Sequence, residues 1–339
     1  MVTARSPFSQ AVVKCMRKLY PEQLADKSFD NTGLLLEAPL NVHRRLNNSV
    51  LLTVDLTRAV ADEAIARGDS IIIAYHPIIF RGLKSLTLDN SQQDSLLQLA
   101  QEGISVYSPH TAVDATPGAM ADWLCQCAVP DSIQPRLTAE TLYPSPDPPE
   151  DPKFQKAGMG RKITFREPVL LNDILDSIAK KAFSHSHATH TAAPAVGFSV
   201  AIPQDTYRSN ISISTVAACP GSGSSILMKN GKPVADLLLT GELSHHEALA
   251  AIEAGSVVVT LSHSNSERGY LHSKMRQELA AELESEWMNR SNELNFDDKN
   301  KLEQEILEQI LVDGSLQVDV SSRDKDPYEV VCWRNGEEV

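Results

Sequence analysis

Two side chains that can bind a metal ion lie four residues apart in the second half of the chain. His263 and Glu267 follow a β-branched run at 256–260 that is typical of a buried strand, and a stretch with helical spacing follows at 270–283. If the turn between them is helical, this spacing places the imidazole and the carboxylate on one face. A His and a Glu so placed can share a divalent cation, and the Glu can bridge two. The alternative is an exposed His beside a Glu that favours a helix start through the helix dipole.

Two other predicted strands end in side chains of the same chemical kind. Tyr75 and His76 follow an Ile-rich run, and His110 and Asp114 follow the next strand candidate along the chain. Because the carboxyl ends of parallel strands lie at one edge of a sheet, these side chains can converge with the first pair. Mixed nitrogen and oxygen ligands suit zinc, iron, manganese or cobalt, and an open coordination position leaves room for an activated water. His110 is then a candidate acid or base.

Taken singly, each of these histidines is more typical of a hydrogen-bonded structural residue than of a metal ligand. The metal hypothesis therefore depends on their joint placement. A third interpretation treats all of them as fold residues, and it predicts no stoichiometric metal in protein prepared without a chelator.

The composition limits the classes of function. The chain has 31 basic and 44 acidic residues, a net charge of −13, and we find no run rich in Lys or Arg. This balance argues against direct nucleic-acid binding and against docking on an anionic membrane. The five cysteines are scattered without a CxxC pair, so neither a zinc knuckle nor a disulfide framework is predicted, and a reducing compartment fits best. We find no apolar run that approaches the ~18 residues of a membrane span.

The first residues of the chain are compatible with more than one cellular compartment. Its first 21 residues contain four basic side chains and no acidic one, which suits either a weak mitochondrial presequence or an ordinary first helix. The helical spacing of the apolar residues favours the ordinary helix. We expect a cytoplasmic protein, with mitochondrial or nuclear placement as the alternatives.

A Gly/Ser turn and several further histidines are weaker candidates. The turn at 221–225 offers backbone and hydroxyl donors for an anion such as phosphate, although such turns are common. Its candidate anion contacts are Gly221, Ser222, Gly223 and Ser224. The histidines at 185, 187 and 190 lie in a polar stretch that favours a solvated loop. The motifs GxxxxGK[ST] and GxSxG are absent from the sequence, which weakens nucleotide-hydrolase and serine-hydrolase interpretations.

Strand and helix patterns alternate along the chain, which predicts an α/β architecture. Six motifs, taken in order, also resemble those of the Nif-three-like family, also called GTP cyclohydrolase type 2 homologues. They are FDNTGL (29–34), AYHPIIF (74–80), YSPHTAVD (107–114), CPGSGS (219–224), TGELSHH (240–246) and HSNSERG (263–269). As an ordered set they are specific, whereas each motif alone is weak.

The resemblance implies two α/β domains of Nif-three-like fold, with a dinuclear metal site in the cleft between them. It also implies a homo-oligomer, often a hexameric ring. The implied metal ligands are His76, Asp114, His263 and Glu267, with Glu267 bridging the two ions. Candidates for supporting positions around them are Glu242, His245 and His246.

Tyr75 is a departure from the family pattern, because many bacterial members have His at this position. A neutral phenol is a poorer ligand than imidazole, so an ion that relied on this position would lose a ligand. Eukaryotic members resemble this chain at this residue.

The domain limits expected from the sequence make one of the two domains discontinuous. Residues 1–130 plus 232–339 are expected to form a domain that carries most of the metal ligands, and 131–231 the other domain. An acidic, helix-prone segment at 284–312 is expected to be an insert that covers a surface.

The favoured hypothesis is a metal-dependent hydrolase, GTP cyclohydrolase type 2-like or of phosphoester type, that acts on a small substrate. The alternative is a non-catalytic metal-binding protein with a regulatory, interaction or metal-trafficking role. The family name comes from an interaction with a transcriptional co-activator component, so a protein partner is expected under this alternative.

Overall fold

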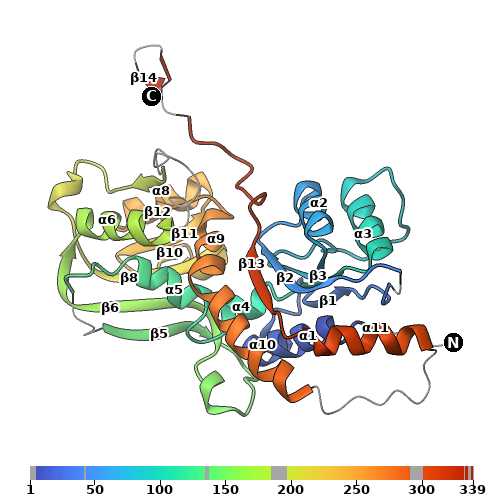
Figure 1. Cartoon of the computed structure of the whole chain (residues 1–339). Coiled ribbons are helices and arrows are strands. Elements are labelled where there is room, and N and C mark those ends of the chain that lie inside the picture. Colours follow the sequence, from blue (N-terminus) through green and yellow to red (C-terminus); the bar gives the residue numbers. More distant parts are fainter. Residues whose placement is uncertain are drawn as a thin grey trace. The chain divides into compact units, whose positions relative to one another are not determined.

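The computed structural model describes residues 5–41, 43–133, 137–184, 197–290, 301–331, 333–334 and 337–338. The chain forms two compact units, and each unit contains its own β-sheet (Figure 1). Unit 1 comprises Met1–Thr116, Asp147–Gln155 and Leu271–Asp324, and unit 2 comprises Pro117–Pro146, Lys156–Tyr270 and Lys325–Val339. The predicted α/β fold class is therefore confirmed.

Unit 1 is built on a five-stranded sheet. The strands across it are β1 (Gly33–Leu36), β4 (Ser105–Ser108), β3 (Asp69–Ala74), β2 (Asn47–Thr53) and β13 (Gln317–Val320). All neighbours pair in parallel except β1, which is antiparallel to β4 at one edge. Every residue of β3 is buried, because a central parallel strand is covered on both faces. The carboxyl ends of β2, β3 and β4 consequently lie at one edge of this sheet.

Helices cover the sheet of unit 1. They are α1 (Pro7–Leu19), η1 (Glu22–Leu24), α2 (Arg58–Arg67), α3 (Ser91–Glu102), α4 (Thr111–Ala115), η2 (Pro152–Phe154), a π-helical turn (Leu271–Met275), α10 (Arg276–Arg290) and α11 (Lys301–Val312). Side chains of α2 and α3, including Val60 and Leu99, pack against Leu51 and Ile72 of the sheet. The apolar face predicted for the first helix is buried, and Lys14 on its polar face pairs with Glu286 of α10 at 2.7 Å.

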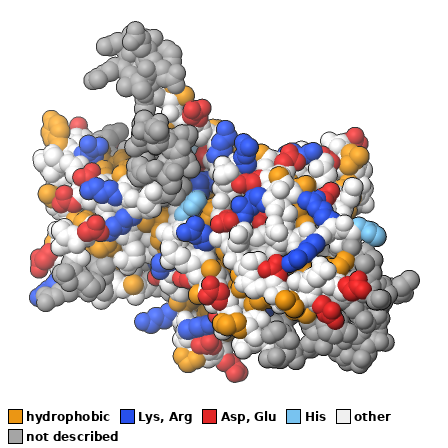
Figure 2. Space-filling view, in the orientation of Figure 1, with side chains coloured by type: hydrophobic (Ala, Val, Ile, Leu, Met, Phe, Trp, Pro, Cys, Tyr) orange, Lys and Arg blue, Asp and Glu red, His pale blue; other side chains and the backbone are white. Residues whose placement is uncertain are grey.

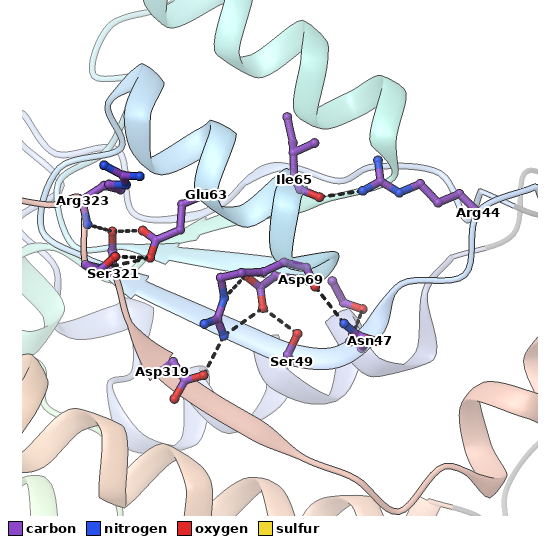
Figure 3. A network of polar contacts seen from close by, with 12 residues as sticks. Arg44, Asn47, Ser49, Glu63, Ile65, Asp69, Asp319, Ser321 and Arg323 are labelled. Atoms are coloured by element: carbon purple, nitrogen blue, oxygen red, sulfur yellow. Dashed lines mark hydrogen bonds and ion pairs between the residues drawn. The ribbon is translucent and has the colours of Figure 1, made fainter.

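Polar contacts attach the edge strand β13 and the residues after it to the rest of unit 1 (Figure 3). The guanidinium of Arg67 donates to Asp69 at 2.9 Å and to Asp319 at 2.6 Å. The Ser321 and Ser322 hydroxyls both donate to Glu63. These side chains bring the end of unit 1 alongside β2, whose following residue, Val54, donates its backbone N–H to Asp324 at 2.7 Å.

Unit 2 is built on a six-stranded sheet. The strands across it are β5 (Leu137–Pro144), β6 (Gly158–Leu170), β8 (Ser212–Ser222), β11 (Leu237–Glu242), β12 (Val257–Thr260) and β7 (Ser199–Ala201). The central strands β8, β11 and β12 are parallel, and the other three pair antiparallel with their neighbours. Leu238 of β11 lies opposite Ala217 and Val258, and all three belong to one buried apolar cluster.

Unit 2 also contains helices and short strands. They are α5 (Met120–Cys127), α6 (Leu171–Ala182), η4 (Arg208–Asn210), α7 (Ser224–Leu227), β9 (Met228–Lys229), β10 (Lys232–Pro233), α8 (His245–Glu253), α9 (Asn265–Tyr270), β14 (Trp333–Arg334) and β15 (Glu337–Glu338). The candidate metal ligands lie just before α9 (His263) and in its first turn (Glu267), and the end of α9 is packed closely. A Cβ on Gly269 would lie 2.4 Å from the Ala182 carbonyl oxygen and 2.7 Å from the Trp123 ring, so only glycine fits there.

Several sequence predictions concern segments outside these elements. The middle of the acidic segment expected at 284–312, residues 291–300, lies outside the described residues, as do the histidines at 185, 187 and 190. Within the described ranges, we find no helix with both the length and the apolar character needed to span a bilayer. On the face in Figure 2, basic and acidic side chains are interspersed.

Candidate metal centre

The backbone of unit 1 fixes His76 at the end of β3. The N–H groups of Tyr75 and His76 donate to the carbonyl oxygens of Thr53 and Val54, at 2.9 and 3.0 Å. His76 Nδ1 lies 2.9 Å from Asp55 Oδ1. Because a carboxylate only accepts hydrogen bonds, this contact assigns the ring proton to Nδ1 and leaves Nε2 as the metal-binding nitrogen. A His–carboxylate pair of this kind is typical of metal ligands in proteins.

Tyr75 and Asp114 meet in the interior of unit 1. The Tyr75 hydroxyl donates to Asp114 Oδ1 at 2.7 Å, and both side chains are buried. Asp114 lies in α4, directly after β4, which explains how the two strand ends come together. The phenol therefore acts as a hydrogen-bond donor to one of the expected ligands. Direct ligation by Tyr75 stays a prediction.

His110 lies beside the same pair. Its ring centroid is 5.5 Å from those of Tyr75 and His76. Its Nδ1 is 2.6 Å from Asp30 Oδ1, and the Thr111 and Thr32 hydroxyls also donate to the Asp30 carboxylate. Burial raises the pKa of Asp30, but these hydrogen bonds and the His110 charge outweigh it and lower the pKa to about 2.

The backbone at His110 is unusual. Its φ of +29° is rare for a residue with a side chain. Strained residues of this kind persist only when the surrounding structure holds them, and the contact with Asp30 is one such restraint. The ring of His110 is thus held in one orientation.

Unit 2 brings His263 and Glu267 together as the spacing predicted. His263 follows β12, and Glu267 lies in the first turn of α9, with His263 Nε2 at 3.6 Å from Glu267 Oε1. Two ligand atoms that each lie about 2.0–2.2 Å from one ion are separated by roughly 3–3.6 Å. His263 Nδ1 is 3.0 Å from Glu242 Oε1, so the ring is braced by a carboxylate in the same way as His76.

Gly221, at the end of β8, borders these two ligand atoms and leaves the space beside them free of a side chain. A Cβ at this position would lie 2.8 Å from Glu267 Oε1 and 2.9 Å from His263 Nε2. Its φ of +61° is also in the left-handed region that favours glycine. A nitrogen and a carboxylate oxygen face each other beside bare backbone, so the residues present in unit 2 fit a divalent cation.

The other sequence candidates of unit 2 have different surroundings. In the Gly/Ser turn, the Gly221 N–H donates to Ser266 Oγ, the Gly223 N–H to the Glu242 carbonyl and Ser224 Oγ to Glu247. These contacts reduce the number of donors that the turn can offer an anion. His245 and His246 are exposed at the start of α8, with ring centroids 5.4 Å apart. Their supporting role and the anion site stay predictions.

Sequence reasoning missed three residues that position the candidate side chains, two in unit 1 and one in unit 2. Asp55 and Asp30 brace histidines, and Ser266 joins the Gly221 backbone to the His263 turn, because its hydroxyl donates to the His263 carbonyl at 2.7 Å. Asp55 could have been found from the sequence, since it lies two residues after the end of β2. Asp30 is part of a recognised motif but is 80 residues from His110, so only the fold reveals their contact.

A sequence model of the family described as Duf34/NIF3 (NGG1p interacting factor 3) matches residues 9–298. The chain belongs to the Duf34/NIF3 family. Among its relatives, the protein NIF3 homolog of Schizosaccharomyces pombe is 41% identical over 84% of this chain and 93% of its own length. The NGG1-interacting factor 3 of Saccharomyces cerevisiae is 36% identical over 78% of this chain and 88% of its own length. The family expected from the six motifs is thus confirmed.

Solved structures agree with the Duf34/NIF3 fold. A Bacillus cereus protein related to NIF3 superposes with a TM-score of 0.63 at 18% identity, over 95% of this chain and 98% of that one. Reduced HcgD from Methanocaldococcus jannaschii superposes with a TM-score of 0.61 at 19% identity, over 94% and 98% of the chains. At these identities the similarity establishes the fold alone.

Proposed function

We propose that His76, His263 and Glu267 bind a divalent metal ion and that the protein is a metal-dependent hydrolase of a small substrate. Asp114 would complete the ligand set, and Glu267 would also help to hold a second ion. His76 and Asp114 belong to unit 1, and the other two residues belong to unit 2.

The observation that carries this proposal is the geometry of His263 and Glu267. Their ligand atoms lie 3.6 Å apart, and a carboxylate holds the opposite nitrogen of the imidazole. In unit 1, His76 has the same carboxylate support. A purely structural histidine does not require a second potential ligand opposite its free ring nitrogen, as His263 has in Glu267. This arrangement and the carboxylate support of both His76 and His263 favour metal binding.

The chemistry follows from these residues. When bound, a divalent ion supplies Lewis acidity and lowers the pKa of water. His110 is the residue of this chain that we propose to move a proton, at Nε2, because Asp30 holds Nδ1 at 2.6 Å. Asp55 and Glu242 orient the two ligand histidines through their Nδ1 atoms. Tyr75 holds Asp114 through its hydroxyl.

Elemental analysis of untagged protein prepared without chelator tests metal binding. We expect at least one divalent ion per chain in the wild type and a loss of at least tenfold in metal affinity for Glu267→Gln. Glu253→Gln is the matched control, because it makes the same change at an exposed position of unit 2, and it should keep the metal. Wild-type protein without stoichiometric metal would contradict the proposal.

Turnover is tested separately on GTP and on a panel of phosphoesters. We expect activity in the metal-loaded wild type and none in the double variant His263→Ala, Glu267→Ala. Activity that survives in the double variant would refute the hydrolase assignment.

A second candidate function has one observation in its favour. The S. cerevisiae relative is called NGG1-interacting factor 3, so a metal-binding protein that works through a partner is the alternative. It predicts bound metal without turnover on any panel. It also predicts that a tagged chain captures a homologous co-activator component, and that capture is weaker when residues 284–312 are deleted. We propose a homo-oligomer under either function, to be measured by light scattering.

A further inference from the structure

A pocket of about 390 Å³ lies beside His263 in unit 2, and the proposed function does not account for it. The residues that matter here are Glu242 and His263 on the sheet side, Phe198 before β7, and Asp326 and Tyr328 from the end of the chain. Small-molecule sites typically occupy about 300–1,000 Å³, so the volume suits a ligand about the size of one ring system with its substituents.

The outer wall of this pocket is a segment that we call the C-terminal strap, residues 325–331. Ser264, the residue after His263, donates its hydroxyl to Asp326 Oδ2 at 2.8 Å, and the N–H of Tyr328 donates to Asp326 Oδ1 at 2.9 Å. Val330 packs on Gly197 so closely that a Cβ there would lie 2.8 Å from Val330 Cγ1. The strap is therefore attached at both ends of the pocket.

The strap lies outside the part of the chain that carries the family match. That match ends at residue 298, whereas the strap begins at residue 325. The pocket thus combines a metal-ligand loop from the matched region with a wall from outside it. Residues that line such a pocket can determine which substrate binds without taking part in the reaction.

The chemistry of the lining indicates the class of ligand. Phe198 and Tyr328 are aromatic, and Phe198 is held by stacking on Phe183 with ring centroids 6.3 Å apart. The ionisable groups of the lining belong to Glu242, His263, Asp326 and the phenol of Tyr328. The lining that the structure describes includes no Lys or Arg. Aromatic side chains favour planar rings, carboxylates accept hydrogen bonds from N–H donors, and two carboxylates repel anions.

We infer that the pocket binds the planar, N–H-bearing heteroaromatic ring of the substrate, with Tyr328 as the stacking residue and Glu242 as the acceptor. This inference rests on the proposed function for its link to catalysis, and it names the substrate class of that site. A phosphate group on the same substrate would lie away from the strap, because Glu242 and Asp326 disfavour it there.

A fluorescence titration with 2-aminopurine riboside tests the inference on the full chain, because the emission of this nucleoside falls when its ring stacks. We expect saturable quenching by the wild type and about tenfold weaker binding by Tyr328→Ala, the usual range for loss of one stacking residue. Tyr328→Phe keeps the ring and should bind like the wild type.

Tyr207→Ala is the matched control, because Tyr207 is 77% exposed on the same unit, close to the 80% of Tyr328, and does not line the pocket. It should leave binding unchanged. Benzoate, a planar anion without N–H donors, should not compete with the riboside. Equal affinity of wild type and Tyr328→Ala, absence of quenching by the wild type, or competition by benzoate would each overturn the inference.

Repeating the titration after chelator treatment separates this inference from the metal proposal. Riboside binding that persists in metal-free protein supports the pocket even if elemental analysis rejects the metal. Stoichiometric metal without riboside binding would sustain the metal proposal and overturn the pocket.

Discussion

Units 1 and 2 hold their histidines in different ways. In unit 1, the side chain of His110 is only 14% exposed and its partner Asp30 is buried. In unit 2, the side chain of His263 is 42% exposed and is braced by the more exposed Glu242, whereas its neighbour Glu267 is 2% exposed. Hydrogen bonds are stronger in a desolvated setting. His110 of unit 1 is therefore positioned by a buried hydrogen bond, whereas His263 of unit 2 has an exposed one and lies beside a buried carboxylate and close backbone.

This difference indicates where each unit is sensitive to change. Loss of one hydrogen bond around His110 or Tyr75 in unit 1 should lower the free energy of unfolding, because these polar groups are buried together. Unit 2 should be sensitive to the space around Glu267 and His263, which the backbone at Gly221 limits. The following predictions test that contrast.

Gly221→Ala should have the largest effect, and the effect should fall on metal binding. The new Cβ would lie within 3 Å of both ligand atoms, so we expect metal affinity to fall at least tenfold, measured by titration of the metal-free protein. Gly231→Ala is the control, because Gly231 also has a positive φ, +73°, but its Cβ would meet nothing within 4 Å. An equal loss of metal affinity in the two variants would show that backbone strain, and not the new Cβ contacts, causes the loss.

Asp30→Asn should produce the next largest effect, and it should depend on pH. The pKa of Asp30 is lowered from 3.8 to about 2, so its contribution to folding is fully present above pH 3.8 and is lost as the pH falls through 2. That shift corresponds to about 2 kcal/mol. Urea unfolding of the variant and the wild type between pH 5 and pH 2 should give curves that converge at the acid end. A difference independent of pH would contradict the buried-pair description of unit 1.

Tyr75→Phe should have the smallest effect, on stability and not on metal. Removing the hydroxyl leaves the buried Asp114 without this donor, which should lower the free energy of unfolding by about 1–2 kcal/mol. Tyr328→Phe removes the same group from an exposed side chain and should change stability little. If Tyr75→Phe instead lost metal while Tyr328→Phe kept it, the Tyr75 hydroxyl would serve metal binding, directly or through Asp114, and the contrast between the two units would fail.

Local patterns predicted much of the fold. The Ile-rich run at 69–74 coincides with β3, and the first predicted helix coincides with α1. The four-residue spacing of His263 and Glu267 brought their ligand atoms together. These features depend on side-chain periodicity over a few residues, so they can be read along the chain.

Other elements escaped the same reasoning. The stretch after His110 carries α4 and α5, which the sequence analysis did not assign, and the helix expected over 270–283 is divided by a π-helical turn at Leu271–Met275. Short helices show little periodicity, and a π-turn follows from packing and not from composition.

Residue types and short spacings in the amino-acid order were sufficient for the α/β class, the family and the candidate ligands. The carboxylates behind the histidines, the glycine beside the ligand atoms and the strap beside His263 emerged only from the folded chain. His110 and Asp30 are 80 residues apart, and Ser264 and Asp326 are 62. Contacts over such separations depend on the order of strands in each sheet and on the paths of the loops, which local periodicity does not specify.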